Sequence, residues 1–469
     1  MALYSSLTVV VLVALVSVPH STASARDRWF GQSDSYGNEP LMLTPLLRQG
    51  FVKKAQADSR VYSENLKLLP KSHAGFITVD NVKKNHLFFW YFPSPNESAP
   101  LLIWLNGGPA VSSMLGLLWE HGPIEANRSK YGSEGFGLRE HTWVGPYSVV
   151  YIDNPVGTGF SFSESGDAGF KLTKKGYTDD LFNFVLQFMD LFPEYKDNGI
   201  YLGGQSYAGK YIPALGYRLQ HDAPQIPLSG IILGGPYFDP PTESVAFFDY
   251  LYAVGAISHY DKTTNQEKVK DMYKNFTKGM HENSTFLELF EDLVLTRDLP
   301  LPSLDNYVKG EDADYSLVLS VLNHPYVREA IHVGGQDFYV SNDNLSLKYG
   351  PDVMVSTKME MAYLMDRVKV LIYNGDYDVV VSSVMIEEAL LTTPWRYQFQ
   401  YNQAKRKIWN MNAGKKLKGF YTQINNFCRV VVHGAGHQTP HDMPETSLEM
   451  VTNFLNHGCI NPENYQGVA

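Results

Sequence analysis

The sequence predicts an α/β protein with a mixed, mostly parallel sheet and helices on both faces. From residue 87 onward, short apolar runs typical of strands alternate with stretches of helical periodicity. Two of these runs, Leu101–Leu105 and Val149–Ile152, are almost entirely apolar, as strands covered on both faces are. The 469 residues are 44% hydrophobic, which suffices to bury one large core.

Each predicted element follows from its own residues. The predicted strands cover residues 87–92, 101–105, 149–152, 200–203, 229–233, 368–373 and 429–432. Amphipathic periodicity predicts helices over Thr178–Leu191 and, near the C-terminus, over Pro444–His457. Between about residues 237 and 320 the pattern changes to polar helical stretches that contain scattered Tyr and Phe. We interpret that interval as a helical cap inserted into the core.

The expected organisation has four segments, the first of which is removed. They are a signal peptide at 1–25, core residues 26–236, the cap at 237–320 and core residues 321–469. Leu7–Val18 is an apolar run too short to cross a bilayer, and the small-residue triplet at 23–25 is typical of a cleavage site. These features predict entry into the secretory pathway, with a lysosomal and an extracellular destination both open.

Sequons and cysteines fit that pathway. Five Asn-x-Ser/Thr sequons are potential glycan acceptors, at Asn96, Asn127, Asn275, Asn283 and Asn344. The two cysteines are Cys428 and Cys459. A helix that follows a strand runs back beside the sheet, so the two residues are expected close together. A disulfide and two buried thiols both remain open.

The charge of the chain argues against two classes of partner. A formal net charge of −10 leaves no basic surplus to neutralise the phosphates of a nucleic acid or an anionic membrane. No stretch beyond the N-terminal run approaches the length of a membrane span. Monomer and homodimer are both compatible with the sequence.

A nucleophile elbow is predicted around Ser206. The apolar strand at 200–203 runs into Gly-Gln-Ser-Tyr-Ala and then into a helical pattern. The elbow is a tight turn that admits only small residues two positions before and after the nucleophile, and Gly204 and Ala208 meet this need. An ordinary serine at a helix N-terminus has the same local pattern, so the assignment depends on the rest of the chain.

Candidate acid and base residues follow Ser206 in the order that an α/β-hydrolase uses, each in a loop after a late strand. His437 would take the serine proton as general base, while an aspartate orients the imidazole and stabilises its cation. Asp376 and Asp378 are both available. We predict Asp378, because the last position of the turn points back across the sheet end. The side chain of Asp376 is instead expected to cap that turn.

The fold class is therefore predicted as an α/β-hydrolase. His433 and His441 are the nearby alternatives to His437, but neither lies at the glycine-flanked apex of its loop. The loop WLNGGP after the strand at 101–105 is expected to supply an oxyanion donor, the backbone N–H of Gly108. The second donor would be the N–H of Tyr207.

Several motifs together resemble the serine carboxypeptidases, most closely their vitellogenic-like branch. The motifs are WLNGGP at 104–109, EHGP at 120–123, YIDNPVGTGFSF at 151–162, SYAGKY at 206–211 and GAGH at 434–437. The resemblance runs from about residue 43 to the C-terminus. It implies removal of C-terminal residues from peptides through an acyl-enzyme, without a metal or organic cofactor.

The resemblance also implies a site for the free α-carboxylate of the substrate. The family uses one Asn and two Glu, and Asn106 and Glu120 match two of these positions. The third position is Gln205, which cannot ionise and can donate a hydrogen bond to Glu120 or to the substrate. A bond to the charged form of Glu120 would favour its ionisation, and thus weaken the binding of peptide acids near neutral pH.

The chain departs from the family pattern at other positions too. Ala110 and Val111 stand where the family usually has Gly-Cys or Gly-Gly, and a positive φ at position 110 would cost about 1 kcal/mol. Gln438 replaces an apolar residue and is expected to line the pocket for the departing residue, while Gly235 replaces Asp or Asn. Two alternatives therefore stay open: an esterase or acyltransferase, and a catalytically weakened homologue that binds peptides.

Overall fold

The computed structural model describes residues 39–66, 69–127, 130, 135–279, 301–309, 315–410 and 416–460. Its centre is an 11-stranded sheet in which six neighbouring strands run parallel. In spatial order these are β6 (Ser148–Ile152), β3 (Leu101–Leu105), β8 (Ile200–Gln205), β9 (Leu228–Gly234), β10 (Lys369–Gly375) and β13 (Phe427–Val432). The predicted signal peptide at 1–25 and the sequon at Asn283 lie outside the described residues.

Antiparallel strands flank this parallel centre on both sides. They are β1 (His73–Asp80), β2 (Asn85–Phe92) and β7 (Phe162–Ser163) on one side, and β12 (Leu417–Ile424) and β11 (Lys407–Asn410) on the other. A separate pair is formed by β4 (Ile124–Ala126) and β5 (Phe136–Leu138). The predicted class, a mixed and mostly parallel sheet with helices on both faces, is confirmed.

Alternating side chains of the central strands enter two different cores. In β3, Leu101, Ile103 and Leu105 pack into one apolar cluster, and Leu102 and Trp104 pack into the other. Successive side chains of a strand point to opposite faces, so an apolar run of this kind needs a helical layer on each side.

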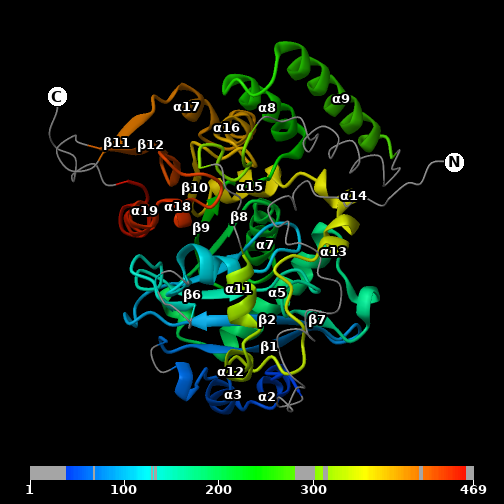
Figure 1. The fold of residues 1–469 in the computed structure, drawn as a ribbon, viewed down its shortest axis with the longest axis vertical. Helices are drawn as coiled ribbons and strands as arrows, with labels where there is room; N and C mark the ends of the chain where they lie inside the picture. The colour runs from blue at the N-terminus through cyan, green and yellow to red at the C-terminus, as the bar shows by residue number, and fades with distance from the viewer. Residues whose placement is uncertain are drawn as a thin grey trace.

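Helices form both layers (Figure 1). The first layer contains α3 (Val52–Asp58), α5 (Lys174–Leu191), α7 (Ala208–Asp222), α8 (Pro240–Ala253), α15 (Lys358–Met365), α16 (Ser383–Leu391) and α17 (Gln398–Gln403). The second contains the π-helical segment η2 (Gly116–His121), α11 (Ser316–Leu322), α12 (Pro325–Ala330) and α19 (Pro444–His457). Shorter helices are α2 (Thr44–Arg48), α6 (Tyr195–Asn198), α13 (Asp343–Lys348), α14 (Gly350–Val353) and α18 (Thr439–Asp442).

Local signals explain where several elements begin and end. The helix predicted from Thr178 begins four residues earlier, because the Thr173 side chain accepts a hydrogen bond from the N–H of Gly176 and caps α5. The predicted C-terminal helix has the same bounds as α19. Gly458, the next residue, adopts the left-handed conformation and caps the helix.

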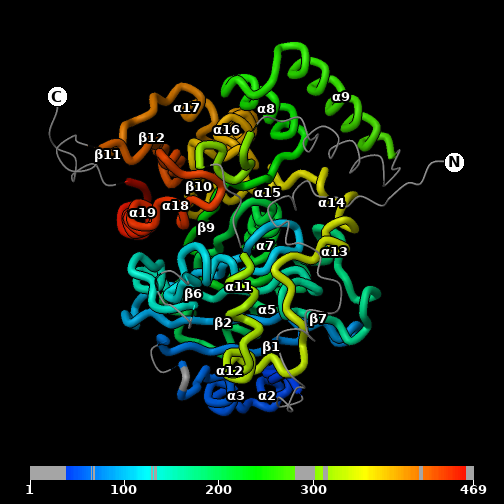
Figure 2. The backbone as a smooth tube through the Cα atoms, in the orientation of Figure 1, coloured from blue at the N-terminus to red at the C-terminus, as the bar shows by residue number. Residues whose placement is uncertain are grey.

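The interval predicted as a cap contributes helices to both layers. α8 packs against α16, and α9 (His259–Thr277) packs against α8 at the top of the view in Figure 2. By contrast, α11 belongs to the opposite layer. Residues 280–300 and 310–314 of this interval lie outside the described residues.

A disulfide joins Cys428 and Cys459, whose Cα atoms lie 5.3 Å apart. Cys428 is in β13, and Cys459 comes two residues after the end of α19, so the helix returns to the sheet as the sequence suggested. The sequence left open a disulfide and two buried thiols, and the structure contains the disulfide.

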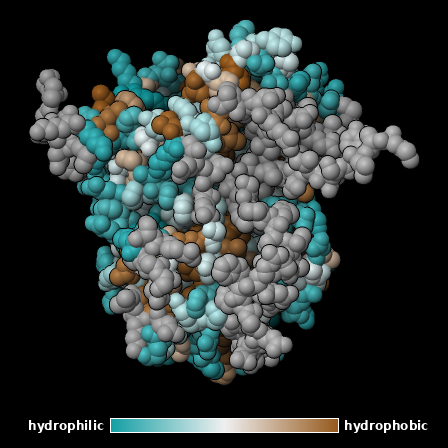
Figure 3. All heavy atoms as spheres, in the orientation of Figure 1, coloured by the Kyte–Doolittle hydropathy of each residue, from teal (hydrophilic) through white to brown (hydrophobic). Residues whose placement is uncertain are grey.

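On the face shown in Figure 3, hydrophilic side chains surround apolar ones that lie near the middle of the view. Asn96, Asn275 and Asn344 are exposed, while Asn127 is half-buried and its Oδ1 accepts a hydrogen bond from the Lys130 N–H. No helix in the described part of the chain is both long and apolar enough to cross a membrane.

Candidate active site

The predicted triad residues lie at one edge of the sheet, where parallel strands end. Ser206 follows β8 directly, Asp378 follows β10, and His437 follows β13. These strands belong to the consecutive series β8-β9-β10-β13, and the carboxyl ends of parallel strands meet at the same edge. The sheet order therefore gathers three residues that are more than 50 positions apart in the chain.

Ser206 occupies a strained elbow between β8 and α7. Its φ of 60° lies in the left-handed region, which non-glycine residues seldom adopt. Its N–H donates to the carbonyl of Gly234, and its own carbonyl accepts from the N–H groups of Gly209 and Tyr237. A Cβ at Gly204 would come within 2.6 Å of the Ala208 side chain, which explains why the turn needs small residues there.

Asp378 and His437 form a buried pair. The imidazole Nδ1 lies 2.9 Å from Asp378 Oδ2, while Asp378 Oδ1 accepts from the N–H of Val381 at the same distance. Burial alone would lower the pKa of His437, but the adjacent Asp378 carboxylate outweighs it, so that the pKa is raised. The pair can therefore orient the ring and stabilise its cation.

Asp376 has a different set of partners. Its Oδ2 lies 2.6 Å from His433 Nδ1, and its Oδ1 accepts from the N–H of Gly434. His441 stacks on the ring of Trp119. Neither His433 nor His441 is paired with Asp378, so the structure separates the favoured residues from their alternatives.

The histidine loop and the elbow are in direct contact. Gln205 Nε2 donates to the carbonyl of His437 at 3.2 Å. A Cβ at Gly235, which has φ of 47°, would lie 3.0 Å from Asp378 Oδ2 and 3.2 Å from His437 Nδ1. A side chain at position 235 would therefore crowd the acid–base pair in this structure, and glycine avoids that contact.

The loop after β3 lies against the elbow. A Cβ at Gly107 would come within 2.5 Å of the backbone N of Tyr207 and 2.9 Å of the Ser206 Cβ. Gly108 has φ of 107°, and Ala110 has φ of 68°. Ala110 therefore has the positive φ that costs a non-glycine residue about 1 kcal/mol.

Asn106 and Glu120 form the core of the predicted carboxylate site. Asn106 Nδ2 donates to Glu120 Oε1 at 2.9 Å, and Glu120 Oε2 has no hydrogen-bond partner among the described residues. Burial raises the pKa of Glu120 to about 7. At acid pH its carboxyl is therefore neutral and can donate a hydrogen bond.

Gln205 does not form the expected hydrogen bond to Glu120. Its amide N–H donates to His437, and its Oε1, which is also buried, has no partner within the part of the chain described. The expectation that such a bond favours ionisation of Glu120 is thus not met, because burial dominates. The sequence could not show that the side chain at position 205 reaches a loop 232 residues away.

Gln438 has an aromatic neighbour that the sequence analysis missed. Its Nε2 donates to the hydroxyl of Tyr315, and the Tyr315 ring packs edge-on against Trp119. Tyr315 directly precedes α11. Its only signal in the sequence was an aromatic residue in a polar stretch, which does not specify a contact 123 residues away.

Comparison with known proteins decides the family. Residues 64–457 match the serine carboxypeptidases, peptidase family S10. The chain belongs to the serine carboxypeptidase family. The resemblance seen in the motifs is thereby confirmed.

Relatives of this serine carboxypeptidase match over most of their length. The probable serine carboxypeptidase CPVL of Rattus norvegicus is 35% identical over 442 residues, which cover 89% of each chain. The vitellogenic carboxypeptidase of Aedes aegypti is 32% identical and covers 92% of each. The venom serine carboxypeptidase of Apis mellifera is 32% identical, over 88% of this chain and 90% of its own.

A solved structure has the same fold. The crystal structure of Kex1(delta)p, a prohormone-processing carboxypeptidase from Saccharomyces cerevisiae, aligns with a TM-score of 0.71. The alignment covers 86% of this chain and 96% of that one at 20% identity, a level that establishes the fold alone. The α/β-hydrolase prediction is confirmed, and the chain is a hydrolase that acts on peptides.

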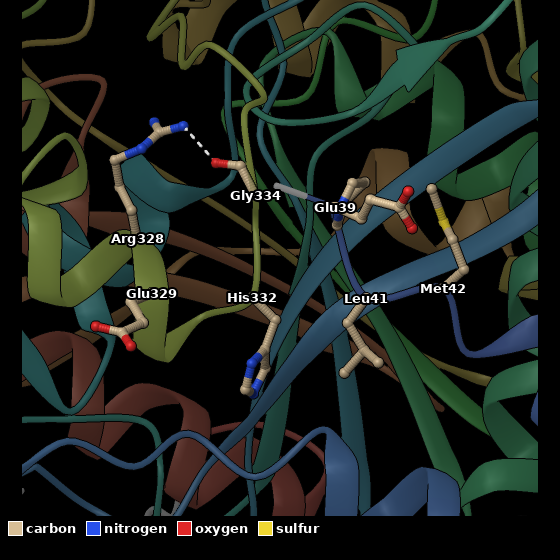
Figure 4. A pocket seen from close by; sticks show the side chains of 8 residues that line it. Glu39, Leu41, Met42, Arg328, Glu329, His332 and Gly334 are labelled. Atoms are coloured by element: carbon tan, nitrogen blue, oxygen red, sulfur yellow. Dashed lines mark hydrogen bonds between the residues drawn. The ribbon is translucent and has the colours of Figure 1, made fainter. Parts of the chain in front are cut away.

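A cavity of about 440 Å³ is lined by none of the predicted triad residues (Figure 4). Glu39, Met42, Glu329 and His332 are among its lining residues, and none of the lining residues belongs to the site described above. The side chain of Arg328 donates to the carbonyl of Gly334 at its rim.

Three buried carboxyls of this serine carboxypeptidase are expected to lose their stabilising contribution as the pH rises from about 4 to 7. Burial raises the pKa values of Glu120, Asp153 and Asp180 to about 7 in the folded state. Unfolded carboxyls titrate near 4, so these three groups hold more protons in the folded state between the two values, and their contribution to stability falls through this window. Buried histidines such as His73 and His121, whose pKa values burial lowers, contribute with the opposite sign, so a variant must be compared with wild type. We expect the melting temperature of Asp180→Asn, relative to that of wild type, to rise by a few degrees between pH 4.5 and pH 7.5, and an unchanged difference would contradict the assignment.

Proposed function

We propose that the protein is an acid-adapted serine carboxypeptidase in which Ser206, Asp378 and His437 form the catalytic triad. In this mechanism His437 takes the proton of Ser206 as the hydroxyl attacks the last peptide carbonyl. The N–H groups of Gly108 and Tyr207 bind the resulting oxyanion. The imidazolium then protonates the departing amino group, and water releases the acyl-enzyme through the same steps.

The buried 2.9 Å contact between Asp378 and His437 supports this proposal best. The Asp378 carboxylate fixes which ring nitrogen of His437 carries the proton. The hydrogen bond from Gln205 to the His437 carbonyl connects the histidine loop to the elbow. An isolated serine at a helix N-terminus would need neither contact.

We infer that Asn106 and Glu120, with Gln205, receive the α-carboxylate of the substrate. At acid pH the Glu120 carboxyl is neutral, and its Oε2, which has no partner among the described residues, can carry the proton that is donated to the substrate. As the pH rises through about 7 this carboxyl ionises and repels a substrate carboxylate. Binding of peptide acids should therefore weaken over that range, while ester binding should change little.

The remaining proposals concern the setting of the enzyme. The N-terminal apolar run supports a signal peptide and a lysosomal or extracellular location. Exposure of Asn96, Asn275 and Asn344 supports glycosylation at those positions. Residues 237–320 are proposed as the cap, and Gln438 as part of the pocket for the leaving residue.

The triad is tested with Ser206→Ala and a fluorophosphonate probe. We expect the wild-type protein to be labelled at Ser206 and the variant neither to be labelled nor to turn over peptides. Labelling that persists in the variant would show that the nucleophile is elsewhere. Incubation with a blocked dipeptide, its amide and its ester distinguishes the other activities, since turnover of the ester alone would favour an esterase or acyltransferase.

Gln205→Glu is expected to raise kcat/KM for blocked dipeptides about fivefold at acid pH, with little change for esters. At acid pH a protonated carboxyl at this position can still donate to the His437 carbonyl, and it can offer the substrate carboxylate a stronger hydrogen bond than the amide, a gain of about 1 kcal/mol. The measurement compares the free acid with its C-terminal amide between pH 4 and 7. An equal effect on both would exclude Gln205 from the carboxylate site.

A further inference from the structure

One short segment of the chain contacts both loops that carry the acid and the base. Residues Leu301–Lys309 run along the edge of the sheet past the ends of β10 and β13. The carbonyl of Leu304 accepts from the N–H of Val379 at 3.1 Å, and the carbonyl of Asp305 accepts from the N–H of His437 at 2.7 Å. Two consecutive carbonyls therefore hold the residue after Asp378 and the base itself.

Further contacts extend this arrangement beyond the two carbonyls. The N–H of Tyr307 donates to the carbonyl of Tyr377 at 3.4 Å, and the two rings pack edge to face 5.6 Å apart. Tyr250, whose ring packs edge-on against that of Tyr307, donates its hydroxyl to the carbonyl of Asp376. The turn that presents Asp378 is thus bonded to the segment at two positions.

A polar junction fixes the segment to the histidine loop. Asp442 Oδ2 accepts from Asn306 Nδ2 at 2.9 Å and from the N–H of Gly436 at 2.7 Å, and Asp442 Oδ1 pairs with Lys309 at 2.5 Å. Asn306 is 4% exposed, and its Oδ1 in turn accepts from the N–H groups that follow it. One amide therefore shapes the segment and also binds the carboxylate that holds the residue before His437.

We propose that residues 301–309 form a strap that sets the relative position of the two triad loops, with Asn306 and Asp442 as positioning residues for His437. The loops come from different strands, and an error of about 1 Å in the placement of a reacting group can cost about 100-fold in rate. Both cysteines of the chain lie in its last part, so no disulfide holds the strap. This inference rests on the proposed role of His437 as general base.

Substitution of the Asn306 amide or of the Asp442 carboxylate tests the strap. Asn306→Asp places two carboxylates about as close as the present 2.9 Å contact, and Asp442→Asn removes the charge that binds Asn306. We expect each variant to lower kcat and the rate of fluorophosphonate labelling at least tenfold, with KM within threefold of wild type. Asp442 Oδ2 accepts from both Asn306 Nδ2 and the N–H of Gly436, so an asparagine at position 442 cannot keep both bonds, and both single variants should show the loss.

A buried Asn–Asp pair elsewhere provides the matched control. Asn85 Nδ2 donates to Asp180 Oδ2 at 3.2 Å, in contact with neither triad loop. Asn85→Asp should lower the melting temperature but leave kcat and the labelling rate of the folded enzyme unchanged. If Asn306→Asp does not fold, Asn306→Ala, which removes the donor without adding charge, takes its place.

The outcomes separate this inference from the proposed function. Loss of labelling in Ser206→Ala together with wild-type rates in both strap variants would overturn the strap alone. An equal loss of kcat and labelling rate in Asn85→Asp would also overturn it, because general destabilisation gives that result. Labelling that persists in Ser206→Ala would instead overturn the triad.

Discussion

Asp378→Asn is expected to lower kcat by about 10⁴ with little change in KM, the largest effect of any conservative substitution in this protein. The Asp378 carboxylate accepts a hydrogen bond from His437 Nδ1–H, and this keeps Nε2 unprotonated and free to take the serine proton. An asparagine can present its N–H₂ group to Nδ1 instead and hold the wrong tautomer. Steady-state kinetics with a blocked dipeptide, together with the labelling rate, measure the loss.

Asp376→Asn is the matched control, since the two carboxylates lie in the same turn. Asp376 contacts His433 and the N–H of Gly434 rather than the base, so we expect less than a tenfold decrease in kcat. A larger loss from Asp376→Asn than from Asp378→Asn would show that the carboxylates have been assigned the wrong way round.

Gly107→Ala is expected to lower kcat for peptides and esters alike by 10² to 10³, about the cost of one oxyanion donor. The added Cβ would lie 2.5 Å from the backbone N of Tyr207, so that one of the two must move. Both substrates pass through a tetrahedral oxyanion, and the factor should therefore be the same for each. This distinguishes the substitution from Gln205→Glu, which should affect only substrates with a free carboxylate.

Gly335→Ala controls for the general effect of adding a methyl group. A Cβ at Gly335 meets nothing within 4 Å, so neither kcat nor the melting temperature should change. If Gly107→Ala retains the wild-type kcat for esters, the loop after β3 does not form the oxyanion hole.

The sequence predicted those parts of the site that depend on strand order and local turns. Ser206 directly follows a strand, Asp378 and His437 lie in the loops after two others, and parallel strands bring their carboxyl ends to one edge. The elbow could be predicted because its steric limits fall on Gly204 and Ala208, two positions either side of the nucleophile. Similarly, strain at Ala110 depends only on the φ of that residue, so the sequence could identify the position, and the structure has φ of 68° there.

Contacts between distant irregular segments could not be predicted. The strap at 301–309 has no periodicity, and its bonds to residues 379 and 437 are made by main-chain groups that carry no sequence signal. Tyr315 reaches Gln438 across 123 positions, and Gln205 reaches the His437 carbonyl rather than Glu120. In each case tertiary packing chose among several hydrogen-bond partners that the residue type alone permits.

The Cys428–Cys459 disulfide closes a covalent ring that contains His437, Gly436 and Asp442 but neither Ser206 nor Asn306. The base and the carboxylate that anchors its loop thus remain tethered within a short ring even when the chain is unfolded. Because the entropy of closing a loop grows with its length, this part of the site is the least demanding to reassemble. Refolding must instead recover the long-range docking of the nucleophile and the strap onto the ring, and recovery of activity should follow those two events.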